Sequence, residues 1–490
     1  MSVQALRREP APSIALEQLQ ATLERQRSAF LAQPVPSYQQ RREHLRALLA
    51  LVLDNEGRVT EALASDFGSG PSGRSPEESR RIEVLPCAMA IRHSIRHLRR
   101  WMRPSRRSTH WATWPSRARV EYVPLGVIGV ISPWNYPITL ALGPLAGSLA
   151  AGNRAMLKPS ELTPATSALL SELLAKTYDE SHVAVATGGV EVAQAFSSLP
   201  FDHLLFTGST SVGRHVMRAA SEHLVPVTLE LGGKSPTLID EAFDIGKEVG
   251  SLVHGKWMNA GQTCIAPDYL LVHESRVDEV VERLRLQVAK HYPSLALNDD
   301  YTAIINERHR ERLLGYLEDA REKGATLLEI NPGDEAAERF AETNKIPPTL
   351  VLDVSDSMRI MQDEIFGPLL PIKPYKSVDE AIEYVNARPR PLAAYVYSDR
   401  RAVIERFGSR VVSGALSVNA AAIHFAQDEL PFGGVGHSGM GRYHSHEGFL
   451  TFSHQKAVYH QLRPNLMHLV APPYQGELKR RMLDFLLSFG

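Results

Sequence analysis

The chain has few cysteines, almost no net charge and no long apolar run. Its two cysteines in 490 residues cannot form a disulfide framework or a cysteine-rich zinc site. A formal net charge of −1 provides no overall field that would attract nucleic acid or anionic membranes. No segment reaches the roughly 18 uninterrupted apolar residues of a membrane-spanning helix, and residues 1–20 lack the apolar core of a signal peptide. We therefore expect a cytoplasmic protein without a nucleic-acid partner or a membrane span.

The length and the hydrophobic pattern together predict two or three domains of the α/β class. Residues from about 15 to 102 have the three- and four-residue apolar spacing of helices. From position 124 onward, short apolar runs such as "LGVIGVIS", "AMLKP" and "HLLFTG" alternate with stretches that resemble helices. This alternation is typical of a doubly wound parallel sheet. A new set of strands and helices begins near Gly232 and indicates a second α/β domain.

Polar side chains follow several of the predicted strands. Asn135 lies in "ISPWNYP", Lys158 and Glu161 in "LKPSE", and Glu230 in "LELGGK". A single residue of this kind is usually a turn or a cap, but ligands bind beyond the carboxyl ends of the strands in such sheets. Together with Cys264 in "GQTCIAPDY" they fit one chemistry. A thiolate attacks a carbonyl group, an amide and a backbone N–H stabilise the oxyanion, and a carboxylate activates water.

The stretch "FTGSTSVG" lies between a predicted strand and a predicted helix. Its glycines, Gly208 and Gly213, flank Ser209 where a backbone could approach a phosphate at the start of a helix. The pattern is weak by itself, because turns of Gly, Ser and Thr open many helices. Three histidines, His437, His444 and His446, have no thiolate or carboxylate at a usable spacing. We expect them to belong to a closing loop and expect no metal.

Taken together, "PWNYP", "KPSE", "FTGS", "LELGGKSP", "GQTCIAPDY", "EIFGPLLP" and "PFGGVGHSGMG" resemble the motifs of the NAD(P)-dependent aldehyde dehydrogenases, in the order that this family has them. The segments "GQTCIAPDY" and "YHSHEGFLTFSHQKAV" are most similar to the class 3-like branch. Within that branch, "RHLRRWMRPSRR" and "KWMNAGQTCIAPDY" look most like bacterial coniferyl aldehyde dehydrogenases.

The resemblance implies a role for each residue that matches a family motif. Cys264 would be the nucleophile, and its own backbone N–H and the Asn135 amide would form the oxyanion hole. Glu230 would be the base for deacylation, with Glu364 as its rival. The residues implied in cofactor binding are Trp134, Lys158, Glu161, Gly208, Ser209, Gly213, Glu364 and Phe366. Because Glu161 would bond the ribose hydroxyls, the first choice of cofactor is NAD, while NADP stays open. Tyr136, Trp257 and Met258 either line an aromatic substrate pocket or belong to the packing, whereas Cys87 is expected in the core.

The same resemblance implies the architecture and the activity. A dinucleotide-binding domain would comprise residues 1–105 and 127–231, a catalytic domain 232–420, and a small β bridging region 106–126 and 421–490. The bridging strands and the amphipathic tail "LKRRMLDFLLSFG" imply a homodimer or a dimer of dimers. The implied reaction is oxidation of an aldehyde to its acid through a cysteine thiohemiacetal and thioester, with coniferaldehyde as the first substrate. The alternatives are a dehydrogenase of long-chain aliphatic or general aromatic aldehydes, and a catalytically retired NAD-binding protein. A cysteine peptidase would need a histidine beside the thiol, and no histidine lies in such a motif.

Overall fold

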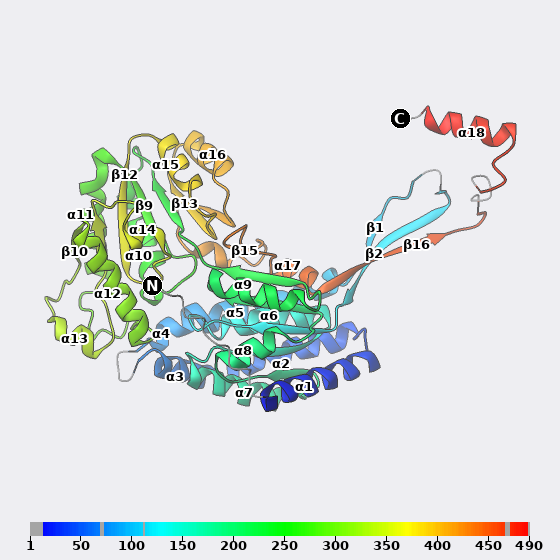
Figure 1. Ribbon diagram of the computed structural model, residues 1–490, viewed down its shortest axis with the longest axis horizontal. Helices are drawn as coiled ribbons and strands as arrows, with labels where there is room; N and C mark the ends of the chain where they lie inside the picture. Colours follow the sequence, from blue (N-terminus) through cyan, green and yellow to red (C-terminus); the bar gives the residue numbers. More distant parts are fainter. Residues whose placement is uncertain (1–12, 69–72, 111–112, 466–470, 489–490) are drawn as a thin grey trace, which may run out of the picture.

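The computed structural model describes residues 13–68, 73–110, 113–465 and 471–488, and these form three β-sheets with helices packed around two of them. Figure 1 shows the two larger sheets within the body of the molecule and the smaller one extending away from it. Residues 1–12, which belong to the segment where we expect no signal peptide, lie outside the described residues. Within the described ranges, no helix combines the length and the apolar character needed to cross a membrane.

The amino-terminal region is helical, as its apolar spacing predicts. Its elements are α1 (Ser13–Ala32), α2 (Tyr38–Asp54), α3 (Glu56–Asp66), α4 (Pro76–Ser79), the π-helical turn η1 (Arg80–Val84) and α5 (Leu85–Trp101). Ser37 opens α2 with a capping box, in which the Ser37 and Gln40 side chains each satisfy the other residue's backbone N–H. The apolar faces of α2 and α5 pack against α6 (Thr139–Ala151).

The first large sheet has six strands in the order β15-β7-β6-β3-β4-β5. Its strands are β3 (Val127–Ile131), β4 (Arg154–Lys158), β5 (Val183–Val185), β6 (His203–Gly208), β7 (Val227–Leu231) and β15 (Gly439–Met440). All neighbours pair in parallel except β15, which runs antiparallel to β7 and places Gly439 opposite Glu230. Helices α1, α8 (Val190–Ser197) and α9 (Thr210–Ser221) cover one face, and α6 and α7 (Pro164–Thr177) cover the other. The sheet is therefore doubly wound, as predicted.

The second large sheet has seven strands in the order β10-β11-β12-β9-β8-β13-β14, all parallel except β10. The strands are β8 (Pro236–Ile239), β9 (Tyr269–His273), β10 (Thr326–Glu329), β11 (Thr349–Leu352), β12 (Leu369–Tyr375), β13 (Ala393–Tyr397) and β14 (Ala415–Val418). The helices and helical turns of this region are η3 (Ile245–Lys247), α10 (Val249–Trp257), η4 (Met258–Gly261), η5 (Glu274–Arg276), α11 (Val277–His291), α12 (Glu307–Glu322), α13 (Ala337–Glu342), α14 (Arg359–Gln362), α15 (Val378–Asn386), α16 (Arg401–Arg410) and η6 (Ile423–Ala426). The later helix α17 (Ser445–Thr451) packs against α5 and α6.

The third sheet is a small arm of three antiparallel strands in the order β1-β2-β16. Its strands are β1 (Ser105–Arg107), β2 (Ser116–Pro124) and β16 (Ser453–Gln461), and the chain continues to α18 (Glu477–Leu487). Figure 1 shows this arm and α18 projecting beyond the body. Leu478, Leu483, Phe485 and Leu487 are all more than half exposed on α18.

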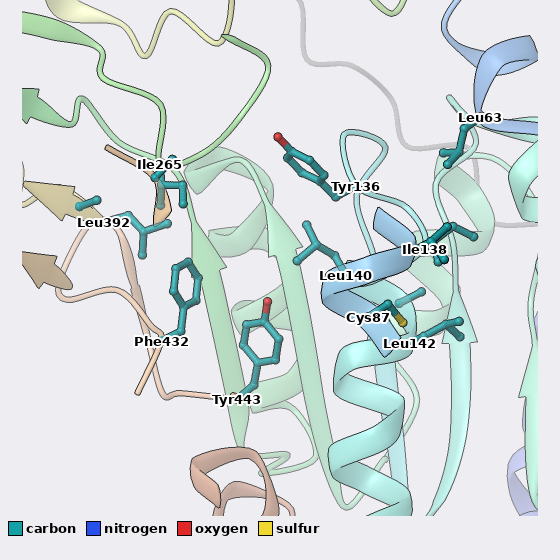
Figure 2. Close-up of a cluster of buried hydrophobic side chains, with 14 of the residues drawn as sticks. Leu63, Cys87, Tyr136, Ile138, Leu140, Leu142, Ile265, Leu392, Phe432 and Tyr443 are labelled. Atoms are coloured by element: carbon teal, nitrogen blue, oxygen red, sulfur yellow. The ribbon is translucent and has the colours of Figure 1, made fainter. Parts of the chain in front are cut away.

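One hydrophobic core runs from the amino-terminal helices to both large sheets. Cys87 is fully buried and packs among residues such as Leu63, Ile138 and Leu142, which confirms its expected place in the core (Figure 2). In the same view, the side chains of Phe432 and Tyr443 lie between the two sheets, on the far side of Leu140 from Cys87. The core thus extends to the side chains that surround the candidate site.

Candidate functional site

The segment before Cys264 has a backbone that is fixed by glycine and by a buried glutamine. Asn259, Ala260 and Gly261 all have left-handed φ angles, of 53°, 51° and 74°. A side chain at Gly261 would collide with the Gly367 carbonyl oxygen, so this turn requires glycine. The Gln262 amide then donates to the carbonyl oxygens of Asn259 (3.1 Å) and Ala303 (3.0 Å), which holds the approach to the cysteine in place.

The structure brings Asn135 to this segment. Asn135 follows β3, is 3% exposed, and donates its amide N–H to the Gln262 carbonyl oxygen at 3.1 Å. The Asn135 carbonyl oxygen in turn accepts hydrogen bonds from Arg74 Nη1 (3.1 Å) and from the Asn259 amide (3.3 Å). Asn135, which follows β3, and the segment before Cys264 therefore belong to one hydrogen-bonded network, although they are more than one hundred residues apart.

Arg74 and Glu83 support this network, and sequence reasoning missed both. Their side chains have no exposed surface, and Arg74 Nη1 lies 3.3 Å from Glu83 Oε1. Glu83 Oε2 also accepts the backbone N–H of Thr139 at 2.8 Å. The Arg74 guanidinium lies 5.2 Å from the centre of the Tyr136 ring. No motif in the sequence marks either residue, because each works through a contact with a residue more than 50 positions away.

A cavity of about 590 Å³ opens onto Cys264. Glu230 and Tyr443 line it, as do the predicted pocket residues Tyr136 and Met258. Further apolar lining residues are Leu140, Ile265, Leu392, Ile423, Phe425 and Phe432. The polar lining residues include Glu78, Arg81, His254, Lys290 and Asp300. Size and lining fit a small organic ligand with an apolar body.

Trp257 lies outside this cavity. The residue is 1% exposed, and its indole N–H donates to the Pro368 carbonyl oxygen at 2.9 Å. Of the two interpretations that the sequence allowed, the structure therefore supports packing. The sequence of α10 does not reveal which of its residues face the cavity, because the cavity is lined by segments far apart in the chain, from Glu78 to Tyr443.

Burial dominates the electrostatics around Cys264. Burial, followed by the charges of Glu364 and Glu230, raises the pKa of the Cys264 thiol to about 12. The backbone N–H groups of Cys264 and Ile265 act in the opposite direction, because they bond the sulfur and lower this pKa. Burial also raises the pKa of Glu230 well above its usual range. Neither carboxyl oxygen of Glu230 has a hydrogen-bond partner within the described ranges.

Glu364 lies beside the glycines that follow β7. Burial and the nearby charge of Asp268 raise the pKa of Glu364 to about 8. A side chain at Gly232 would collide with the Glu364 carboxyl group, and the Gly233 backbone N–H bonds that group. Unlike Glu230, Glu364 is not among the residues that line the cavity of Cys264.

The remaining predicted cofactor residues lie around the carboxyl edge of the six-stranded sheet. Lys158 ends β4, is 1% exposed, and donates to Glu161 at 3.0 Å. Glu161 lines a second pocket of about 580 Å³ with Ser160 and Gly188. Trp134 packs against Phe366, with ring centres 5.3 Å apart.

A helix begins at the same edge of this sheet. Gly208 ends β6, and Ser209 caps α9 by accepting the Val212 N–H at 3.4 Å, while Gly213 packs in the first turns of that helix. A partly exposed carboxylate beside a lysine and an open helix start are groups that suit ribose hydroxyls and a pyrophosphate. The donor set of this edge therefore fits a dinucleotide.

The two large α/β sheets and the partly buried Cys264, on a cavity lined by residues from both, are consistent with the resemblance in the motifs. A family model described as "Aldehyde dehydrogenase family" matches residues 10–458. The chain belongs to the aldehyde dehydrogenase family, which confirms the family and the fold class expected from the motifs.

Two curated bacterial relatives match nearly the whole chain. A "Probable coniferyl aldehyde dehydrogenase" of Pseudomonas aeruginosa is 50% identical over 467 residues, which is 95% of each chain. A "Coniferyl aldehyde dehydrogenase" of a Pseudomonas species is 47% identical over 97% of each chain.

Two solved structures share the fold. The substrate-bound state of Staphylococcus aureus AldH has a TM-score of 0.88 and 36% identity, covering 95% of this chain and 99% of that one. A Mycobacterium tuberculosis aldehyde dehydrogenase complexed with NAD⁺ has a TM-score of 0.81 and 30% identity, covering 92% of this chain and 91% of that one.

Proposed function

We propose that this protein oxidises an aromatic aldehyde, coniferaldehyde first, to its carboxylic acid with NAD as the acceptor. The observation that carries the proposal is the common cavity of Cys264 and Glu230, in which no described group competes for either carboxyl oxygen of Glu230. Both Pseudomonas relatives described above are named for coniferyl aldehyde. The aromatic side chains Tyr136, Phe425 and Phe432 give the cavity an apolar wall that suits a phenyl ring.

In the proposed reaction, the Cys264 thiol loses its proton to solvent, its sulfur forms a bond to the aldehyde carbon, and the carbonyl oxygen becomes the oxyanion of a thiohemiacetal. One N–H of the Asn135 amide is bonded to the Gln262 carbonyl, which orients the group. The other N–H would bind the oxyanion together with the Cys264 backbone N–H. NAD, when bound, would supply the hydride acceptor, and loss of hydride from the same carbon would leave a thioester on Cys264.

Glu230 is the proposed base for hydrolysis of this thioester. Its raised pKa makes the ionised carboxylate a strong base, so it would take a proton from water as the water oxygen bonds to the thioester carbon. The carbon–sulfur bond then breaks, the acid is released, and the proton held by Glu230 returns to the sulfur to restore the thiol. Glu364 is the weaker candidate, because its carboxyl group is bonded by the Gly233 N–H and does not line the cavity.

Glu161, Lys158, Ser209, Gly208 and Gly213 are the proposed contacts of the adenosine and pyrophosphate. Trp134, Phe366 and Glu364 would lie on the nicotinamide side. The acidic side chain at 161 would repel an added 2′-phosphate, which favours NAD over NADP. The Mycobacterium tuberculosis structure, which holds NAD⁺, supports a nicotinamide dinucleotide in this fold.

The activity is tested by following NADH formation with coniferaldehyde, cinnamaldehyde, benzaldehyde, hexanal and decanal, and with NADP in place of NAD. We expect coniferaldehyde to have the highest kcat/KM. Preference for hexanal or decanal would favour an aliphatic dehydrogenase. No turnover by folded protein that binds NAD would favour a retired enzyme. Cys264→Ala should remove turnover but keep NAD binding.

Glu230→Gln separates the two candidate bases. We expect a burst of NADH close to the rate of wild type, followed by steady turnover that is about 10²-fold slower or more, because only thioester hydrolysis needs the base. Glu364→Gln is the matched control, and it should change the affinity for NAD more than the ratio of burst to steady state. A normal steady state in the Glu230 variant would assign the base role to Glu364.

We also propose a homodimer or a dimer of dimers in the cytoplasm, with the domain boundaries at residues 1–105 and 127–231, 232–420, and 106–126 and 421–490. The nine-residue edge strand β16 and the exposed apolar residues of α18 favour pairing with a second copy. Light scattering coupled to gel filtration measures the mass, and a monomer would refute the pairing.

A further inference from the structure

Two histidines of α5 face an acidic segment that continues into the cavity wall. His93 and His97 are four residues apart, so they lie on one face of the helix, with ring centres 4.1 Å apart. Glu429 lies three residues after η6 and brings Oε1 to 3.1 Å from His93 Nε2. One nitrogen or oxygen atom from each of the three residues lies within 4.8 Å of the others.

The hydrogen bonds of His93 and His97 leave the Nε2 atom of each ring available to bind an ion. His97 Nδ1 lies 3.0 Å from the His93 carbonyl oxygen, so Nδ1 carries the hydrogen and Nε2 keeps its lone pair. His93 Nε2 is buried and makes no hydrogen bond within the described ranges, although Glu429 Oε1 is close to it. Their separation is near the roughly 3.3 Å between two ligands of a tetrahedral zinc ion with bonds of about 2.0–2.1 Å. We propose that His93, His97 and Glu429 bind one divalent transition-metal ion of the Zn²⁺ type.

The surrounding charges favour such an ion. Asp428 Oδ2 lies 3.9 Å from His93 Nδ1, on the side of the ring away from the ion, where carboxylates commonly orient metal-bound histidines. Near His93 there are two negative charges, from Asp428 and Glu429, and one positive charge, from Arg96. Two imidazoles and one carboxylate select Zn²⁺, Co²⁺ or Ni²⁺ over Ca²⁺ and Mg²⁺.

The position of this site gives it a structural consequence. Phe425 and Phe432, on either side of Glu429 in the sequence, line the cavity of Cys264, and Pro86 at the start of α5 lines it too. An ion held by α5 and Glu429 would therefore fasten the 425–432 segment to the helix. This proposal departs from the sequence-based expectation of no metal, because Glu429 is more than 300 residues away from the two histidines.

The test is a Co²⁺ titration of the full chain followed by visible spectroscopy. We expect d–d bands that saturate at one equivalent and no thiolate-to-metal charge-transfer band, because the proposed ligands are nitrogen and oxygen. His97→Gln and Glu429→Gln should each weaken the affinity for Co²⁺ by about tenfold or more. Glu429 is 69% exposed at its side chain, so its variant does not threaten folding. The control His454→Gln, on an exposed histidine of β16, should bind as wild type does.

Thermal unfolding gives a second readout that does not use turnover. Zn²⁺ should raise the Tm of wild type and of His454→Gln but not of the two ligand variants, because only a native site is stabilised by its ligand. A thiolate band would place the ion on Cys264 and overturn the proposal. Unchanged affinity in both ligand variants, or no d–d bands at all, would overturn it too. None of these results depends on whether the protein oxidises aldehydes.

Discussion

Arg74 and Glu83 form an ion pair with no solvent-exposed side-chain surface. We expect Arg74→Met to lower both the Tm of the protein and kcat. Removing one partner leaves the other as an uncompensated buried charge, which typically costs about 3–5 kcal/mol. For a domain of about 150–250 residues, each kcal/mol lowers Tm by about 2–4 °C, so the Tm of the variant should fall by about 6 °C or more. The Asn135 carbonyl also loses its 3.1 Å bond from Arg74, so kcat should fall as well.

Differential scanning calorimetry of matched variants measures this effect. Arg58→Met removes an ion pair with Glu172 whose side chains are 47% and 40% exposed, and it should lower Tm far less than Arg74→Met does, because water solvates both charges. The double variant Arg74→Met/Glu83→Gln should lose less than the sum of its single variants, because neither charge is left alone. Additive losses, or an Arg74→Met variant as stable as Arg58→Met, would refute the reasoning.

Three further outcomes follow from the geometry around Cys264. The rate of alkylation of Cys264 by iodoacetamide should rise about tenfold per pH unit between about pH 7 and 10, because a pKa of about 12 leaves the thiol protonated over this range. Mass spectrometry locates the adduct. A rate that reaches a plateau near neutral pH would contradict a pKa raised by burial. Glu364→Gln should speed this alkylation only above pH 8, where the native carboxyl group is ionised and raises the pKa of Cys264; a larger effect below that pH would be inconsistent with a pKa of about 8. Gly261→Ala should lower both Tm and the amplitude of the NADH burst, because the left-handed φ and the Gly367 carbonyl leave no room for a methyl group. The control Gly324→Ala should lower Tm alone, because Gly324 also has a left-handed φ but has open space around it.

The sequence predicts those candidate site residues that occupy fixed places in short motifs. Asn135 follows β3, Glu230 lies within β7 rather than after it, and Cys264 precedes β9. Apolar runs make these strands visible in the sequence. The alternation of strands and helices likewise predicts both large sheets. Local patterns are sufficient where a residue's role depends on its neighbours in sequence.

The residues that the sequence could not identify act across long separations. Arg74 reaches Asn135 over 61 positions, and nothing in "GRSPEES" indicates a buried cation. The sequence left the direction of the Trp257 side chain open because segments far apart in the chain line the cavity. The His93, His97 and Glu429 group needs two segments that only the folded chain brings together. These features follow from tertiary packing, which a single sequence does not display.

The two-residue strand β15 has a consequence for the order in which the protein is made. It pairs with β7 at Gly439 and Glu230, so the surroundings of Glu230 include a segment synthesised about 200 residues later. A ribosome adds about 5–20 residues per second, and domains generally fold as they emerge. At this rate, about ten seconds or more would pass before β15 is synthesised, and during that time Glu230 would lie on the uncovered edge strand β7. Cys264, the proposed nucleophile, would already be synthesised at that time, so the surroundings of the site would be complete only near the end of translation.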